Sequence, residues 1–288
     1  MRTLVALMAG LCLAGTVLAA TPASPSPTSD PVDAQLLESR ATQAAIWGMP
    51  VVNYDLMRQQ MLTKTAGKEN QFVFWGRPLD WHNQTLTPNP DTIYFMTFLD
   101  TKEAGPMVLV IPPANDSGSL NANIVNVWQA PLEDAGLLGI DKGKGIKLLI
   151  VPPDQKGPWP AGYEVLEPGT FGSYALVRSN MKSHEPADVA KSIAYAKTVK
   201  LYPLSQAANP PATAFIDVQN IDFDSTIRYD DTFFDNLNRV VQFEPWLDRD
   251  RVMIDQLRSL GIEKGKPYPP ASDYLSCYLI LIDMVRGR

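Results

Sequence analysis

The sequence predicts an α+β fold, in which an antiparallel β-sheet region in the middle of the chain is flanked by amino-terminal and carboxyl-terminal helices. Apolar residues recur at helical spacing before residue 62 and again after residue 186. Between them, short runs of β-branched and aromatic residues alternate with clusters of Gly, Pro and Asp. Since 45% of the 288 residues are hydrophobic, the chain can bury a core of the size that a globular domain needs.

The first 20 residues carry the pattern of a cleavable signal peptide. Arg2 supplies a positive charge, residues 4–18 are apolar, and Ala19 and Ala20 provide small residues at the expected cleavage site. The apolar stretch is barely long enough to cross a bilayer and no positive charges follow it, so a membrane anchor is the weaker interpretation. We therefore expect an exported protein in the periplasm, or alternatively outside the cell, with no membrane span after cleavage.

Residues 21–30 predict a tether rich in Pro, Ser and Thr, and the folded domain is expected over residues 31–268. The domain begins with a helix that Asp30 caps and Pro31 starts, and we expect Gly48 and Pro50 to end it. A second helix is expected over residues 52–61.

Strands and further helices follow in order. The pattern predicts strands over residues 92–99, 107–111, 123–129, 147–151 and 174–178, each bounded by turn residues. It predicts helices over residues 187–197, 232–242 and 248–260. Gly261 followed by Ile262 indicates a left-handed glycine cap, closed by an apolar contact, at the end of the last helix.

A long loop over residues 72–92 concentrates the candidate functional side chains, and loops of this length are often functional. His82 titrates near neutral pH, Asp91 can orient or accept a proton, and Tyr94 completes the candidate catalytic set. Aromatic walls and polar groups are typical of a small-molecule pocket. The candidate ligand-binding residues are Trp75, Arg77, Asp80, Trp81, Asn89 and Thr92.

The same loop has a purely structural interpretation, which stays open beside the functional one. Asn89 and Asp91 can cap a turn by binding their own backbone, and Arg77 can pair with a carboxylate. Trp75 and Trp81 can cover the core.

Several function classes receive no support from the sequence. The 25 Lys and Arg residues against 31 Asp and Glu leave no basic run, so a nucleic-acid partner is not expected. No glycine cluster has the spacing of a phosphate-binding loop. The two histidines, His82 and His184, lack the spaced partners of common zinc sites, so no metal or cofactor is indicated.

The segment from Thr87 to Tyr94, with Gly105, Pro106 and Met107 after it, resembles an exported bacterial family called domain of unknown function 1254. The resemblance covers residues 41–268. It implies an α+β amino-terminal domain, usually followed by a β-sandwich-like domain of unknown function 1214, and it implies no activity. Asn89, Asp91, Thr92 and Tyr94 match the family, whereas Pro90 stands where members often have a second Asn.

The carboxyl end departs from that pattern. Residues 269–288 form an apolar tail with Cys277, and no sequence of the length of the second domain follows. We expect a truncated or frame-shifted product, which resequencing of the gene beyond Tyr268 would test.

Three functional hypotheses follow. The first is a periplasmic, hydrolase-like enzyme acting on a small polar substrate. The second is a non-catalytic module that binds a small-molecule ligand or a partner. The third is an inactive fragment of a two-domain protein. The oligomeric state stays open.

Overall fold

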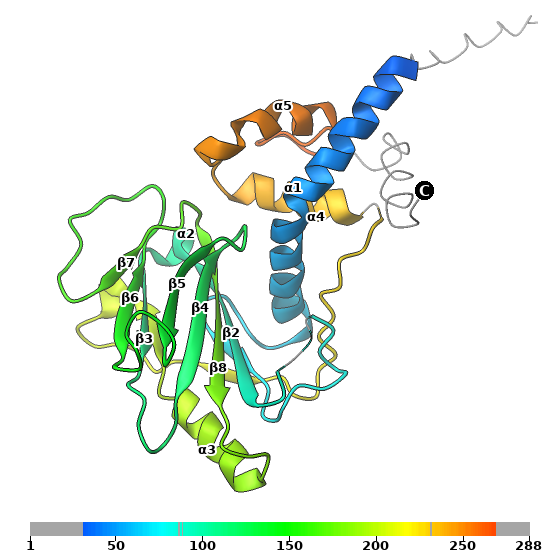
Figure 1. Ribbon diagram of the computed structural model, residues 1–288. Coiled ribbons are helices and arrows are strands. Elements are labelled where there is room, and N and C mark those ends of the chain that lie inside the picture. Colours follow the sequence, from blue (N-terminus) through cyan, green and yellow to red (C-terminus); the bar gives the residue numbers. More distant parts are fainter. Residues whose placement is uncertain (1–30, 86, 88, 231, 269–288) are drawn as a thin grey trace, which may run out of the picture.

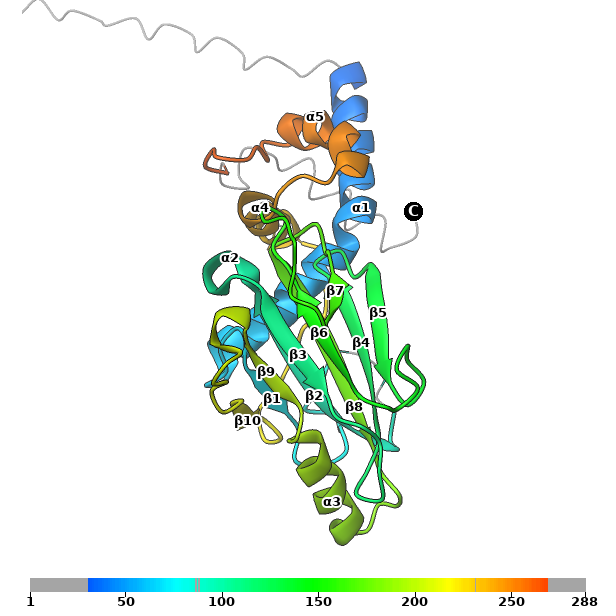
Figure 2. The ribbon, with the colours of Figure 1, turned by 90° about the vertical axis from the view of Figure 1, so that its left-hand side faces the viewer.

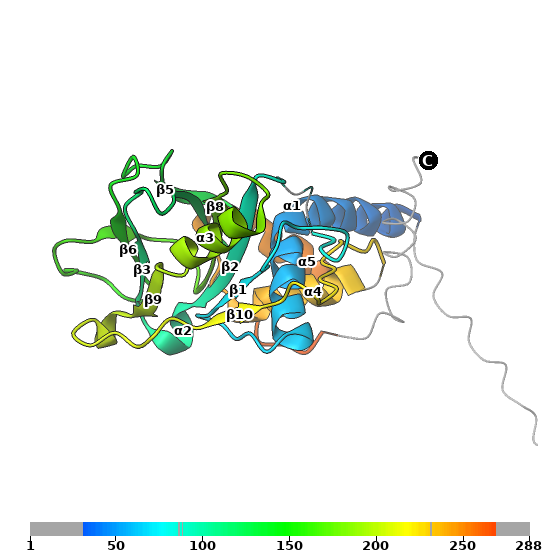
Figure 3. The ribbon, with the colours of Figure 1, turned by 90° about the horizontal axis from the view of Figure 1, so that it is seen from below.

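The computed structural model describes residues 31–85, 87, 89–230 and 232–268 and folds them into three layers. Two β-sheets pack face to face, and helices cover the other face of the larger sheet. Figure 1 shows helices α1, α4 and α5 gathered beside one end of the sheets, and Figure 3 shows the three layers from below. The α+β prediction, with a sheet region between helices, is confirmed.

The larger sheet has the strand order β10-β1-β2-β8-β4-β5. The smaller sheet has the order β7-β6-β3-β9. Neighbouring strands are antiparallel, except that β1 runs parallel to β10 and β6 parallel to β7. The strands are β1 (Phe72–Phe74), β2 (Thr92–Asp100), β3 (Met107–Ile111), β4 (Leu120–Asn126), β5 (Pro131–Gly136), β6 (Ile146–Ile150), β7 (Glu164–Leu166), β8 (Gly172–Asn180), β9 (Lys200–Pro203) and β10 (Phe215–Asp217).

Helices lie at both ends of the sheets. Within the described ranges they are α1 (Pro31–Lys64), α2 (Thr101–Ala104), α3 (Pro186–Ala196), α4 (Thr232–Phe243) and α5 (Arg251–Ser259). Figure 2 shows α3 at the end of the sheets opposite α5. The expected helices over residues 187–197, 232–242 and 248–260 therefore correspond to α3, α4 and a short 3-10 turn (Asp248–Asp250) that continues into α5.

Strand β2 lies between two apolar cores and is buried along its whole length. Ile93, Phe95 and Leu99 face the smaller sheet, whereas Tyr94 and Phe98 face the helices. A strand covered on both faces reads as a continuous apolar run rather than as an alternating one. This burial makes β2 and its neighbour β8 the centre of the molecule.

The expected helix break at Gly48 and Pro50 is wrong, because α1 continues through both residues. Proline removes one backbone donor, and the carbonyl that loses it belongs to the exposed Ile46 and can bind water. The bend of α1 in Figure 1 agrees with a proline inside a helix. Gly48 serves helix packing, since a Cβ there would lie 3.0 Å from both methyl carbons of Leu237 on α4.

Two strand predictions are also corrected. The strand expected over residues 123–129 starts earlier and ends at Asn126, because Gln129 adopts a positive φ of 55° in the turn to β5. The loop over residues 72–92 is not wholly irregular, since it starts with β1, which pairs with β2 and β10.

The predicted glycine cap after α5 is confirmed. Gly261 has a φ of 79°. Its N–H donates to the carbonyl of Arg258 at 3.0 Å, and the N–H of Ile262 donates to that of Leu257 at 2.9 Å. This pair of hydrogen bonds defines a Schellman motif.

The predicted signal peptide (residues 1–20), tether (21–30) and apolar tail (269–288) lie outside the described residues, and those predictions stay predictions. Within the described part of the chain, no helix combines the length and the apolar character needed to cross a membrane.

Candidate functional site

The first candidate cluster of the loop is an exposed group around Asp80. Its carboxylate binds Arg77 Nη2 at 3.0 Å and His82 Nδ1 at 2.7 Å. The His82 ring stacks on the exposed Trp81 with 3.7 Å between centroids. The Asp80 carboxylate also accepts a hydrogen bond from the backbone N–H of His82 at 3.0 Å, and the backbone and side-chain hydrogen bonds from His82 lower its pKa. The cluster brings together four of the predicted residues.

Asp91 and Tyr94 lie apart from that group. The Asp91 side chain is 77% exposed and pairs with His184 at 3.4 Å. The Tyr94 hydroxyl accepts a hydrogen bond from Asn89 N at 2.8 Å, and Asn89 Oδ1 accepts one from Asp91 N at 2.9 Å. Hydrogen bonds of this kind, from a side chain to the nearby backbone, are what the turn-capping interpretation predicts. The structure therefore pairs His82 with Asp80 and Asp91 with His184, and the catalytic role of His82, Asp91 and Tyr94 stays a prediction.

The remaining two candidates are inside the protein. Trp75 is buried with its ring edge-on to Phe223 at 5.6 Å between centroids, and Thr92 is buried at the start of β2. Among the described residues, no group of three His, Cys, Asp or Glu side chains is placed to hold a metal ion.

A cavity of about 390 Å³ lies between α1, α2 and the end of α4, and we call it the α1–α4 pocket. Cavities of this size suit small-molecule ligands. Its polar lining comes from Tyr54, Asp55, Arg58, Lys102, Arg239, Gln242 and Glu244, and its apolar lining from Val240 and Phe243.

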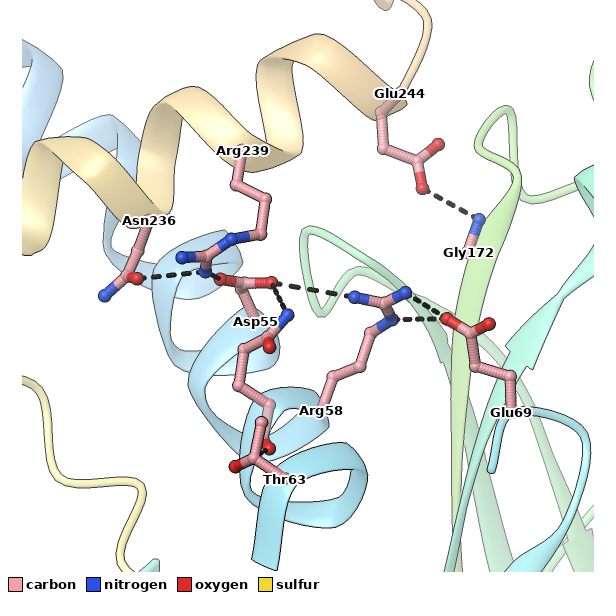
Figure 4. Close-up of polar contacts among 9 residues, drawn as sticks. Asp55, Arg58, Thr63, Glu69, Gly172, Asn236, Arg239 and Glu244 are labelled. Atoms are coloured by element: carbon pink, nitrogen blue, oxygen red, sulfur yellow. Dashed lines mark hydrogen bonds and ion pairs between the residues drawn. The ribbon is translucent and has the colours of Figure 1, made fainter. Parts of the chain in front are cut away.

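Glu244 directly follows α4 and is only 4% exposed. Its oxygens accept hydrogen bonds from the backbone N–H groups of Phe171 at 2.7 Å and of Gly172 at 2.8 Å. Figure 4 shows the carboxylate of Glu244 directed at Gly172, at the start of β8. Burial raises the pKa of Glu244 to about 7, although the two hydrogen bonds act to lower it. Near neutral pH this carboxyl therefore exchanges a proton readily.

Tyr54 meets Glu244 over the start of β8. A Cβ at position 172 would lie 2.8 Å from the Tyr54 hydroxyl oxygen and 2.8 Å from Glu244 Oε1, so a larger residue there would have to displace both groups. Burial, followed by the charge of Glu244, raises the pKa of Tyr54 well above its usual value. The phenol thus stays protonated and can donate a hydrogen bond beside the carboxyl group.

An ion-pair network forms the wall that α1 and α4 share. Asp55 is buried and pairs with Arg239, while Arg58 Nε binds Glu69 Oε1 at 2.7 Å (Figure 4). Burial raises the pKa of Asp55, and the charge of Arg239 acts in the opposite direction. Each carboxylate of this wall therefore has a guanidinium partner, and the pairs tie α1 to α4 and to the segment before β1.

Lys102 supplies a cation that is not committed to a carboxylate among the described residues. Its Nζ lies 4.5 Å from the centroid of the Phe243 ring and 5.3 Å from that of Phe171. Cation–π contacts hold the ammonium group at the pocket while leaving its hydrogen-bond donors available.

The residues of this pocket were missed by the sequence-based prediction. Arg58 lies four positions after Tyr54 and three after Asp55, and these two spacings bring side chains together on one side of α1. Glu244 did carry a signal, because it lies two residues after the end of the helix predicted over residues 232–242, and a carboxylate near that end opposes the helix dipole. Such a position needs compensating contacts, which the N–H groups of Phe171 and Gly172 provide.

Comparisons with known proteins give a family match for part of the chain and a similar fold. Residues 69–203 match the family model described as protein of unknown function (DUF1254). No curated protein matches the chain. The VPA0106 protein from Vibrio parahaemolyticus has a similar crystal structure, with a TM-score of 0.61 and 17% sequence identity over 87% of this chain and 58% of that one. This likeness shows the fold, and the chain spans 58% of the length of that Vibrio protein.

An uncharacterised protein from Burkholderia cenocepacia is a more distant match. Its TM-score is 0.31 at 12% identity, over 62% of this chain and 50% of the other. The family match includes the loop candidates, Lys102 and Gly172, whereas Tyr54 and Glu244 lie outside it. Residues 69–203 of this chain are therefore similar to the DUF1254 family.

Proposed function

We propose that this protein is an acid–base enzyme that acts on a small polar substrate in the α1–α4 pocket, with Glu244 as the group that exchanges the proton. The observation that carries the proposal is a buried carboxyl group with a pKa of about 7 on the wall of a cavity of about 390 Å³. Perturbed carboxyl groups in cavities are typical of catalytic sites.

Hydrolysis of an ester is the reaction that these groups suit. Ionised Glu244 takes a proton from a water molecule, and the water oxygen bonds to the ester carbonyl carbon. The bond from that carbon to the alcohol oxygen then breaks, and Glu244 returns the proton to the alcohol. The Tyr54 hydroxyl donates a hydrogen bond to the carbonyl oxygen, where negative charge develops.

The charges around the pocket favour a substrate with an acidic group. Asp55 is neutralised by Arg239, and Arg58 by Glu69, whereas Lys102 keeps its charge for a ligand. Lys102 and Glu244 then have separate tasks, since the ammonium group orients the substrate and the carboxyl group moves the proton.

The test is hydrolysis of p-nitrophenyl acetate and related esters by the purified protein and by Glu244→Gln. We expect the rate to rise with pH through about 7 in the parent, because the ionised base is the active form, and to fall by about 100-fold in Glu244→Gln. Glu185→Gln, at the start of α3, is the matched control and should keep both the rate and the pH profile.

Unchanged turnover and an unchanged pH profile in folded Glu244→Gln would refute the role of Glu244. Asp91→Ala separates the two candidate sites, because the exposed Asp91 side chain contributes little to stability. Loss of turnover in Asp91→Ala alone, at an unchanged melting temperature, would indicate that the active site lies in the loop around Asp91 and not in the α1–α4 pocket. Binding of an ester without turnover by any form would favour the non-catalytic module.

A further inference from the structure

A second cavity, of about 150 Å³, lies on the helix-facing side of the larger sheet, and we call it the sheet-face pocket. Its floor comes from neighbouring positions of β2 and β8, where Tyr94 is opposite Arg178 and Met96 is opposite Leu176. The loop after β1 supplies further walls. No residue of its lining also lines the α1–α4 pocket, so the two cavities are separate.

Two hydrogen-bond donors on this floor lack a partner among the described residues. Tyr174 is 7% exposed, and its hydroxyl is buried without a hydrogen bond. The Nε of Arg178 is also buried without a hydrogen bond. Buried polar groups are nearly always paired in folded proteins, so two unpaired donors on one cavity point to a ligand that accepts hydrogen bonds.

Arg178 also brings a positive charge without a carboxylate partner in the described part of the chain. Its Nη2 donates to Asn123 Oδ1, which is a neutral acceptor. Burial raises the pKa of Tyr174 while Arg178 acts to lower it, so the phenol remains a donor and lies within electrostatic reach of the guanidinium group. A cation and a neutral donor together suit an anion.

Some of the other polar atoms around the cavity already have hydrogen-bond partners. The Tyr94 hydroxyl accepts a bond from the N–H of Asn89, and Asn83 Oδ1 accepts one from the N–H of Thr85. Leu79, Met96 and Leu176 make the remaining wall apolar. The cavity therefore offers two donors to an anion and apolar contacts to a short aliphatic body.

We propose that the sheet-face pocket is a binding site for a small aliphatic carboxylate, whose oxygens accept hydrogen bonds from Arg178 and the Tyr174 hydroxyl. A carboxylate fits better than a phosphate, because a single guanidinium group and apolar walls match one charge and a short hydrocarbon chain. The site is independent of the proposed reaction, since none of its groups takes part in it.

The experiment is calorimetric titration of the full chain with sodium propionate, and in parallel with propionamide and inorganic phosphate. We expect saturable binding of propionate, and no binding of the neutral propionamide, which lacks the charge that Arg178 attracts. Tyr174→Phe and Arg178→Gln should each weaken propionate binding by about tenfold or more, the factor expected for a lost hydrogen bond to a charged group.

Tyr174→Phe separates a ligand role from a structural one. The variant removes a hydroxyl that has no protein partner, so its melting temperature should be unchanged or higher. Tyr202→Phe, a buried tyrosine behind the smaller sheet, is the matched control and should bind propionate like the parent. Parent-like binding by Tyr174→Phe, no binding by the parent, preference for phosphate, or a clear loss of stability in Tyr174→Phe would each overturn the proposal.

Discussion

Glu244 combines a structural task with an electrostatic cost. Its carboxyl group ties the end of α4 to the backbone at Phe171 and Gly172, and this contact places it away from water. Removal of water penalises the charged form, and two N–H donors compensate for only part of that loss. The residue is therefore tolerated at a cost in stability whenever it is ionised.

This cost predicts a pH dependence of folding. The folded pKa of about 7 lies above the ordinary glutamate value of 4.5, so the folded state binds the proton more tightly than the unfolded state. The stability that the folded state gains by binding this proton at Glu244 is fully present below about pH 4.5 and is lost as pH rises through about 7. Urea titrations should show the free energy of unfolding falling by up to about 3 kcal/mol across this range.

Glu244→Gln is the comparison for that measurement, because it keeps the shape of the side chain and removes the titration. The difference between parent and variant should vary with pH only in this window. A pH profile that is the same in both proteins would show that Glu244 has an ordinary pKa in the folded state.

At the scale of elements, α1 and α4 form the scaffold of the proposed active site. Gly48 lets Leu237 of α4 approach α1 closely, and Asp55, about two turns after Gly48 on α1, pairs with Arg239 of α4. Because Tyr54 comes from α1 and Glu244 follows α4, the position of one helix against the other sets the distance between the two groups.

Leu237→Ala is predicted to loosen this pair of helices. Leu237 is fully buried, so its truncation should lower the free energy of unfolding by about 2–5 kcal/mol, through lost burial and the cavity left behind. Chemical denaturation measures the effect. Val252→Ala, at an exposed position of α5, is the control and should change stability by less than about 0.5 kcal/mol. Equal effects of the two substitutions would contradict the packing of α4 on α1.

At the scale of the whole molecule, the two faces of the larger sheet differ in kind. The face toward the smaller sheet is closed by apolar side chains such as Phe95, Ala175 and Val177. The other face carries Tyr94, Tyr174 and Arg178 along the same two strands. Both proposed sites lie on this second side, where helices and a loop cover the sheet.

Export is a prediction for the whole chain. If residues 1–20 act as a signal peptide, protein recovered from the periplasm of a bacterial host should begin just after Ala19 or Ala20. Amino-terminal sequencing of the fractionated protein checks this. Full-length protein that starts at Met1 and stays in the cytoplasmic fraction would contradict it.

Local patterns predicted the longer elements well. The apolar runs of β2, β3, β6 and β8 and the helical spacing of α3 to α5 arise from neighbouring residues, so they are readable without the fold. Strands of three residues, such as β1 and β10, were missed because so short a strand is held by hydrogen bonds to its neighbouring strands and has too few residues to show a pattern. The break expected at Pro50 failed because tertiary packing overrode a local preference.

The sequence by itself determined the α+β class, the order of the long elements, the glycine cap at Gly261 and a resemblance to the DUF1254 family, since these depend on residues close together in the chain. Only the tertiary structure decided which side chains meet. Glu244 and Tyr54 come together through contacts across almost 200 positions of the chain, and Tyr174 and Arg178 become unpaired donors only when the sheet is covered. Such contacts leave no periodic trace, because burial and pairing are properties of the packed molecule.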